Sequence, residues 1–360
     1  MDAPASLPSE DGAVTIAVDL MGGDNAPLAI VDGMALAAQE APDVRFIAYG
    51  NAAMVAPLIL HNPRLRPVCA VRHSGDKVAS DEKPSIALRT GRNSSMWHAI
   101  GAVKSGQAAA VVSAGNTGAL MAMSKLALRP LPGVHRPAII AVMPTLVDDK
   151  GVVMLDLGAG VEADEGSLVQ FAVMGAIYSR ALFGAKNPRV GLLNIGEEDI
   201  KGRDEIRAAA ALLRERDGLD FQFGGFAEGT DIGKGAFDVI VTDGFTGNVA
   251  LKTVEGTFKL VVGTIKNMAA SSIVDKACAL LAMPLLRRLV GRVDPRKFNG
   301  AMFIGLDGIS VKMHGNSDAV AVCHAVLTAA SLARAGVTGK IRDNIAASLA
   351  APDPEPPPAG

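Results

Sequence analysis

The feature that most constrains the fold is a repeated unit, in which a short apolar run leads into a glycine-rich polar turn and then a helical pattern. Its clearest copy spans residues 237–252, where the β-branched run at 239–241 is typical of a strand buried on both faces. We expect the helix to begin at Val249. The turn before it holds five small or polar residues: Asp243, Gly244, Thr246, Gly247 and Asn248. Such a turn could hold a phosphate or thioester oxygen, although an ordinary βα turn looks the same.

Similar units follow the apolar runs at 14–18, 108–112, 152–155 and 190–193, and a further loop precedes the last long helix. This alternation predicts a doubly wound α/β fold with a mostly parallel sheet and an anion site at its carboxyl edge. Lys252 follows the central turn. The other loops offer polar and glycine residues for contacts with substrate: Asp19, Gly22, Gly23 and Asn25; Ser113, Asn116, Thr117 and Gly118; Asn194, Glu197 and Lys201; and His314.

Several of these residues have two interpretations. His314 either protonates a leaving group or caps a helix. Glu197 lies beside a helix start, where carboxylates are ordinary helix chemistry. The polar run at 80–89 is either solvated surface or a phosphate contact made by Lys83 and Arg89.

The absent motifs narrow the chemistry. The chain has no dinucleotide fingerprint, no Walker lysine motif and no His-Glu-x-x-His, and Ser113 is not in a nucleophile elbow. Three scattered cysteines indicate neither a disulfide framework nor a thiolate metal site. The formal net charge of −2 gives no sign of nucleic acid. We therefore expect a phosphate- or carboxylate-handling enzyme that needs no cofactor, metal or covalent nucleophile.

The chain reads as one α/β catalytic domain over residues 13–340. Residues 1–12 lack the pattern of a signal peptide and are expected to be a disordered extension, and the Pro-rich residues 351–360 a disordered tail. No uninterrupted apolar run reaches the roughly 18 residues of a spanning helix, so a soluble protein is expected, and the scattered cysteines suit a reducing cytoplasm.

Residues 268–298 stand apart as an amphipathic helical insertion with a positive excess. Ser272 to Asp275 resembles a capping box, and Pro284 is expected to restart a short helix. The segment is either a helical hairpin in a dimer interface or core, or an element that rests on anionic lipid. Four leucines are the candidate membrane contacts: Leu281, Leu285, Leu286 and Leu289.

Five motifs carry a family resemblance: DLMGGDNAP at 19–27, VSAGNTGALM at 112–121, GLLNIGEE at 191–198, DGFTGN at 243–248, and His314-Gly315. In this order they closely resemble the PlsX family of bacterial phosphate acyltransferases, over about residues 14–335. The loop at 301–308 departs from the small-residue version usual in that family.

The resemblance implies the reaction of acyl-[acyl carrier protein] with inorganic phosphate to give acyl phosphate and free carrier protein, which feeds phospholipid synthesis. It also implies the fold of the phosphotransacetylase and isocitrate/isopropylmalate dehydrogenase group, and a homodimer. The expected location is the cytoplasmic face of the cell membrane, where a downstream glycerol-3-phosphate acyltransferase is a possible partner.

On this interpretation phosphate attacks the thioester directly, and the enzyme positions it and stabilises the oxyanion. The hypothesis places the phosphate and oxyanion among six residues: Gly244, Thr246, Gly247, Asn248, Asn116 and Thr117. Lys201 and Lys252 would supply positive charge, and His314 would donate a proton to the departing thiol. Two rivals stay open: a dehydrogenase of related fold, and a non-catalytic scaffold for lipid-synthesis enzymes.

Overall fold

The computed structural model describes residues 12–147, 151–216, 218–292, 294, 296 and 300–349. The predicted tail at 351–360 lies outside these residues, as does the predicted extension at 1–12 apart from Gly12.

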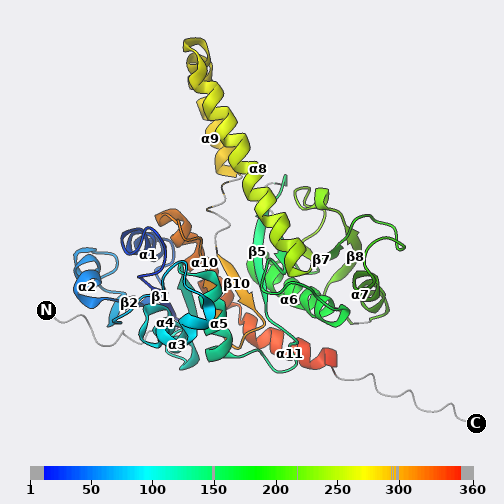
Figure 1. Ribbon diagram of the computed structural model, residues 1–360, viewed down its shortest axis with the longest axis horizontal. Coiled ribbons are helices and arrows are strands. Elements are labelled where there is room, and N and C mark those ends of the chain that lie inside the picture. The colour runs from blue at the N-terminus through cyan, green and yellow to red at the C-terminus, as the bar shows by residue number, and fades with distance from the viewer. Residues whose placement is uncertain are drawn as a thin grey trace, which may run out of the picture.

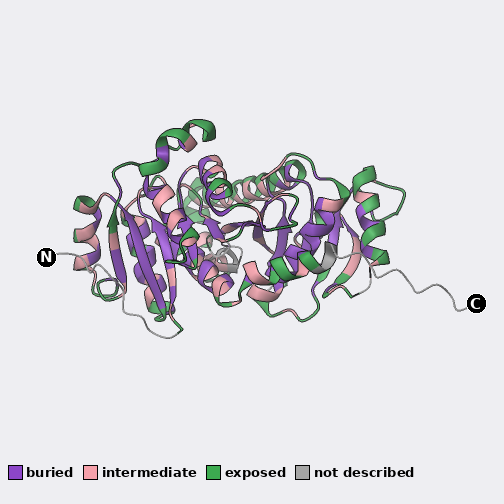
Figure 2. Ribbon diagram, turned by 90° about the horizontal axis from the view of Figure 1, so that it is seen from below, coloured by how far each residue is buried: buried purple, intermediate pink, exposed green. Residues whose placement is uncertain are grey.

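Eleven strands of the described residues form one sheet, in the order β3-β2-β1-β4-β11-β10-β5-β6-β9-β7-β8. Most neighbouring strands are parallel, which confirms the predicted mostly parallel sheet. Figure 2 shows the buried strands between more exposed helices. The bounds are β1 Val14–Asp19, β2 Val44–Gly50, β3 Cys69–His73, β4 Ala110–Ser113, β5 Ala138–Pro144, β6 Gly151–Leu155, β7 Arg189–Leu193, β8 Gln222–Ala227, β9 Val239–Val241, β10 Ala301–Ile304 and β11 Ile309–Lys312.

Three antiparallel pairings divide this sheet into two halves. β10 is antiparallel to both β11 and β5, and β5 is antiparallel to β6. The strands β6, β9, β7 and β8 therefore run opposite to β3, β2, β1, β4 and β11, and the carboxyl ends of the two halves do not share one edge. The expectation that all the loops meet at one carboxyl edge is wrong for this reason.

Helices cover the sheet, as Figure 1 shows. Their bounds are α1 Leu28–Glu40, α2 Ala52–His61, α3 Pro84–Thr90, α4 Ser95–Lys104, α5 Thr117–Leu128, α6 Glu165–Phe183, α7 Asp204–Glu215, α8 Gly244–Ser271, α9 Ile273–Arg292, α10 Ala319–Arg334 and α11 Val337–Leu349. Short 3₁₀ turns lie at Gly91–Asn93 and Gly229–Asp231. α1 packs on α10, α4 on α5, and α6 on α7 and α11. α6 is long and apolar enough to cross a membrane, and 72% of its apolar stretch is buried inside the protein.

Helices α8 and α9 pack side by side and project from the body (Figure 1). The Ser272 hydroxyl accepts a hydrogen bond of 3.0 Å from the Asp275 N–H, as the predicted cap requires. The expectation of a new helix at Pro284 is wrong, because α9 is one helix with Pro284 inside it. The two helices form a hairpin, which we call the α8–α9 hairpin.

Candidate active site

The buried carboxylate of Asp19 joins two of the predicted loops at the carboxyl ends of β1 and β4. It accepts hydrogen bonds from the Ser95 hydroxyl at 2.6 Å and the Ser113 hydroxyl at 2.7 Å. A Cβ at Gly22 would lie 2.5 Å from Asp19 Oδ2 and 2.7 Å from the Gly115 nitrogen. Asp19, Gly22 and Ser113 therefore hold the loops against each other, and their contact with substrate stays a prediction.

The loop that carries His314 is attached to the β1–α1 loop. The Asp24 N–H donates to the Gly315 carbonyl at 2.7 Å, and the Asn25 amide donates to the Ser317 carbonyl at 3.2 Å. A Cβ at Gly23 would lie 2.9 Å from the Gly315 oxygen. Gly23 and Asn25 thus place the predicted histidine next to the β1 and β4 loops.

Lys312 completes this corner, and the sequence reasoning missed it. It ends β11 beside Ser113, and its Nζ lies 3.5 Å from the Ala114 carbonyl oxygen. Desolvation lowers the pKa of Lys312 to about 8, while the negative charges of Asp19 and Asp24 oppose that shift. A lysine at the carboxyl end of a buried strand was the sequence signal that could have revealed it.

Helix α8 brings Lys252 and Glu255 to His314. The Lys252 ammonium donates to Glu255 Oε2 at 2.9 Å, and Glu255 Oε1 lies 3.7 Å from His314 Nε2. Desolvation by the surrounding protein lowers the pKa of His314, Glu255 opposes this, and the charges of Lys312 and Lys252 add to it. The imidazole is still 54% exposed, at the open side of the corner. Glu255 was also missed, although it lies three residues after Lys252.

Asn116 caps α5 and tethers the polar run at 80–89. Its Oδ1 accepts from the Ala119 N–H at 3.0 Å, and its Nδ2 donates to the carbonyls of Ser80 and Glu82, both at 2.9 Å. Thr117 is exposed at the helix start, and a Cβ at Gly118 would lie 2.7 Å from Pro84. The amide hydrogens of Asn116 point to backbone carbonyls in this state, so its role as an oxyanion donor stays a prediction.

The central turn belongs to helix α8, and the expected helix start at Val249 is wrong. Asp243 caps the helix: its Oδ1 accepts from the Thr246 N–H at 2.8 Å, its Oδ2 accepts from the Thr246 hydroxyl, and it pairs with Arg203. A Cβ at Gly244 would lie 2.2 Å from the Gly160 oxygen, and one at Gly247 2.0 Å from the Asp156 oxygen. The glycines therefore allow close packing of α8 on the loop after β6.

Asp156 shapes that loop and was not singled out from the sequence. Its carboxylate is buried and accepts N–H bonds from Ile139, Gly158, Ala159 and Gly160. Burial raises the pKa of Asp156, and these backbone bonds oppose the shift. A Cβ at Gly158 would lie 3.3 Å from the Cβ of Asn248, so this loop forms the wall beside Asn248.

Asn194, Glu197 and Lys201 lie farther along the second half of the sheet. The Asn194 amide donates to the carbonyls of Gly196 and Lys201, at 3.2 and 3.1 Å, and so closes its own loop. Lys201 pairs with Glu198 at 2.8 Å, a hydrogen bond that raises the pKa of the lysine. Glu197 is exposed. These residues belong to the β7 side, whereas Lys252, Glu255, His314 and Lys312 gather where α8 passes the first half.

The predicted membrane residues lie on α9. Leu281 is 83% exposed and Leu285 is 62% exposed, whereas Leu286 is half-buried. The side chain of Leu289 lies outside the described set.

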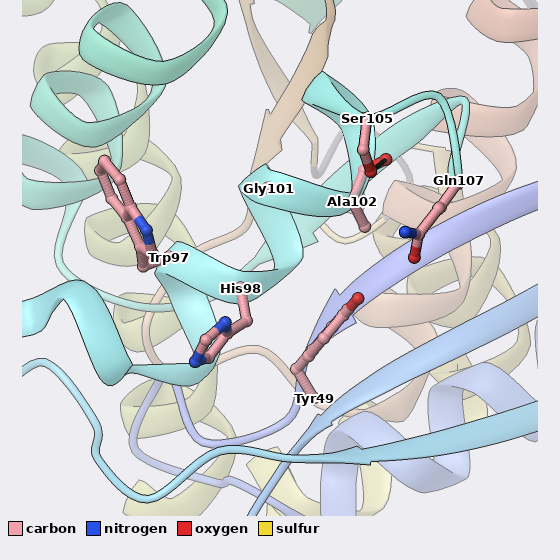
Figure 3. Close-up of a pocket in the computed structure, with 7 residues that line it drawn as sticks. All are labelled: Tyr49, Trp97, His98, Gly101, Ala102, Ser105 and Gln107. Atoms are coloured by element: carbon pink, nitrogen blue, oxygen red, sulfur yellow. Dashed lines mark hydrogen bonds between the residues drawn. The ribbon is translucent and has the colours of Figure 1, made fainter. Parts of the chain in front are cut away.

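A separate hollow of about 220 Å³ lies between β2 and α4 (Figure 3). Tyr49 reaches from β2 toward Gln107, and the rings of Tyr49 and His98 stack with centroids 6.2 Å apart. Its lining residues are Tyr49, Trp97, His98, Gly101, Ala102, Ser105 and Gln107, none of them a predicted site residue. Within the described ranges, no three His, Cys, Asp or Glu side chains gather as a metal site requires.

Comparison with known proteins settles the family. A family model described as fatty acid synthesis protein matches residues 14–340. The phosphate acyltransferase of Rhodospirillum rubrum is 49% identical over 334 residues, which cover 93% of this chain and 95% of that protein. That of Rhodospirillum centenum is 52% identical over 336 residues, covering 93% and 94%. The chain belongs to the PlsX family of phosphate acyltransferases.

Solved structures agree on the fold. The EutD phosphotransacetylase from Staphylococcus aureus matches with a TM-score of 0.56 at 17% identity, covering 89% of this chain and 94% of that one. A phosphotransacetylase from Streptococcus pyogenes matches with a TM-score of 0.57 at 15% identity, covering 90% and 94%. The predicted α/β fold of the phosphotransacetylase group and the predicted family are confirmed. As a PlsX family member the protein is an acyltransferase.

Proposed function

We propose that this PlsX family member transfers the acyl group of acyl-[acyl carrier protein] to inorganic phosphate, and that the acyl phosphate feeds phospholipid synthesis. A phosphate oxygen forms a bond to the thioester carbonyl carbon, the carbon–sulfur bond breaks, and the carrier thiolate takes up a proton. The cluster of Lys252, Glu255, His314 and Lys312, where α8 passes the carboxyl ends of β1, β4 and β11, carries this proposal.

The cluster suits a reaction with an anionic nucleophile. Phosphate is already charged near neutral pH, so the enzyme's task is to position it and to stabilise the oxyanion. Desolvation lowers the pKa of Lys312 to about 8, which is above pH 7, so the ammonium form is available to bind an anion. We propose that Lys312 and Lys252 hold the phosphate, and that Asn248 and Asn116 donate to the oxyanion when substrate is bound.

His314 is proposed to donate the proton to the departing sulfur. Its lowered pKa makes the imidazolium a stronger acid, and Glu255 at 3.7 Å orients the ring. Lys201, on the β7 side, is proposed to extend the positive field of the site.

The exposed leucines of α9 support two further proposals from the sequence: peripheral attachment to the inner face of the cell membrane, and assembly as a homodimer. At the membrane, the product would be available to a downstream glycerol-3-phosphate acyltransferase.

The direct test incubates the purified protein with palmitoyl-[acyl carrier protein] and labelled phosphate, and traps acyl phosphate with hydroxylamine. We expect hydroxamate that forms only when phosphate is present. Intact thioester after prolonged incubation, with carrier protein still bound, would instead support the scaffold interpretation.

A further inference from the structure

The α8–α9 hairpin is strongly basic in an otherwise acidic protein. Residues 244–292 hold seven lysines and arginines and two acidic residues, a net charge of +5, whereas the whole chain has a formal net charge of −2. Such an asymmetry favours an anionic partner at the hairpin and steers its approach.

Three lysines of α8 lie on one side of the helix. Lys252, Lys259 and Lys266 are spaced by seven residues, close to two helical turns, and all three are exposed. Neighbouring members are about 10.5 Å apart along the axis. The residue before each one, at 251, 258 and 265, is a half-buried apolar side chain, so the lysines flank the apolar side of the helix. We call Lys252, Lys259 and Lys266 the lysine stripe.

The stripe starts at the candidate active site. Lys252 bonds to Glu255, which faces His314. The positive charges of both Lys252 and Lys259 act on His314, so these two lysines lie on the side of α8 that faces the reaction centre. From there the stripe leads outward along the helix for about 21 Å.

We propose that the lysine stripe is the docking surface for the acidic carrier protein that delivers the acyl thioester. This inference rests on the proposed function, because it assumes a carrier-bound substrate. The carrier protein is too large to enter the corner at His314, so it must rest outside and pass its thioester inward. A row of exposed ammonium groups that ends at the reaction centre fits an acidic partner in that position.

The position of the stripe favours a protein over a lipid surface as its partner. The exposed apolar residues Met268, Ile273 and Val274 lie within about 5 Å of the tip of the hairpin at Ser271 along the helix axes. Lys259 is about 18 Å and Lys252 about 28 Å from that tip along the helix axis. A bilayer that meets the tip reaches Lys266 and Lys276 before Lys259. A loss of binding in Lys259→Glu that Lys276→Glu does not share therefore indicates a protein partner and not a lipid surface.

The test compares Lys259→Glu and the Lys259→Glu/Lys266→Glu double variant with Lys276→Glu, which makes the same charge change at an exposed position of α9. Affinity for fluorescently labelled palmitoyl-[acyl carrier protein] is measured by anisotropy, and turnover is measured with this substrate and with S-hexanoyl pantetheine. Circular dichroism confirms that each variant is folded.

We expect the double variant to bind the carrier protein at least about tenfold more weakly at low salt, with Lys259→Glu accounting for much of this and Lys276→Glu for little. Its turnover of S-hexanoyl pantetheine should equal that of the wild type at a pH low enough to keep His314 protonated, because losing the positive charge of Lys259 raises the pKa of His314 and only moves the fall of the rate to higher pH. The wild-type affinity should itself fall steeply as salt screens the charges.

Equal carrier-protein affinity in all variants would overturn the docking surface while leaving phosphate-dependent turnover, and so the proposed function, intact. An equal loss in Lys276→Glu, together with release from vesicles of phosphatidylglycerol, would assign the stripe to lipid. In the converse case, the wild type binds the carrier protein without making acyl phosphate, while Lys259→Glu binds it more weakly. That pair of results would refute the proposed function and support the docking surface.

Discussion

At the scale of single residues, Lys312 is the partly buried cation of the proposed phosphate site. We predict that Lys312→Met lowers kcat/KM about a hundredfold and raises the KM for phosphate, because removal of one preorganised charged donor typically costs about 3 kcal/mol. Because desolvation lowers its pKa to about 8, the wild-type rate should fall as the pH rises through that value, where the lysine loses its proton. Steady-state kinetics against pH check both effects.

The control for Lys312 is Lys125→Met, at an exposed position of α5. It should leave the phosphate KM and the pH profile unchanged. A Lys312→Met enzyme with the phosphate KM of the wild type would remove this lysine from the phosphate site.

The second residue-scale prediction concerns the Glu255–His314 pair. If His314 is the acid, the rate depends on its protonated form and falls as the pH rises through its lowered pKa. Glu255 opposes that lowering, so Glu255→Gln should move the fall to still lower pH. The profile of kcat/KM between about pH 5 and 8 measures this, and the ionisation of phosphate is common to both enzymes. Superimposable profiles would show that Glu255 does not act on the catalytic proton.

Substitution of the two proposed oxyanion donors, Asn248 and Asn116, should affect turnover alike but stability differently. Asn248→Ala is predicted to lower kcat roughly a hundredfold with an unchanged melting temperature, as loss of an oxyanion donor would. Asn116→Ala should lower kcat and also destabilise the fold by about 1 kcal/mol, because α5 loses its cap. Asn267→Ala, exposed on α8, is the matched control. Full turnover in either active-site variant refutes its proposed role.

Sequence reasoning found Asn116 but not what it holds. The carbonyls that its amide bonds belong to Ser80 and Glu82, more than thirty residues earlier in the chain. Lys312 and Glu255 escaped notice because each is an ordinary residue of a regular strand or helix. Only the fold shows that Lys312 is desolvated and that Glu255 faces His314.

At the scale of elements, the start of α8 depends on glycines that meet another loop. Gly244→Ala would place a Cβ 2.2 Å from the Gly160 oxygen, so we predict a loss of about 1–3 kcal/mol in the free energy of unfolding. Gly256→Ala is the control within the same helix, because its Cβ would meet nothing within 4 Å. It should stabilise the protein by up to about 1 kcal/mol. Urea unfolding measures the free energy of unfolding of both variants. Equal values for Gly244→Ala and Gly256→Ala would mean that the start of α8 can shift away from the loop.

The elements predicted correctly have local sequence patterns, whereas those predicted wrongly depend on contacts distant in the sequence. The strands expected at 14–18 and 239–241 lie within one residue of the bounds of β1 and β9, because their apolar patterns are local. The start of α8 was placed five residues late, since Gly244 and Gly247 read as a turn. The reversal of β10 and β5 has no local signature, and so the opposed halves of the sheet were not foreseen.

At the scale of the whole molecule, the exposed leucines Leu281 and Leu285 of α9 are the proposed site of attachment to a membrane or to a second copy. Leu281→Asp/Leu285→Asp should release the protein from vesicles of phosphatidylglycerol, because charged side chains do not enter the acyl region of a bilayer. Turnover of palmitoyl-[acyl carrier protein] in solution should be kept, since the four residues that define the cluster at His314 all lie outside α9. Leu212→Asp, at an exposed position of α7 remote from the hairpin, is the control.

Vesicle flotation and sedimentation equilibrium, performed on the same samples, distinguish the two partners proposed for these leucines. Release from vesicles with an unchanged molar mass assigns Leu281 and Leu285 to lipid. A fall to the monomer mass with vesicle binding retained assigns them to the interface between two copies. Because the carrier-docking stripe lies on α8 and these leucines lie on α9, neither outcome should alter the affinity for the carrier protein. A parallel loss of that affinity would show that substrate docking and attachment share one surface.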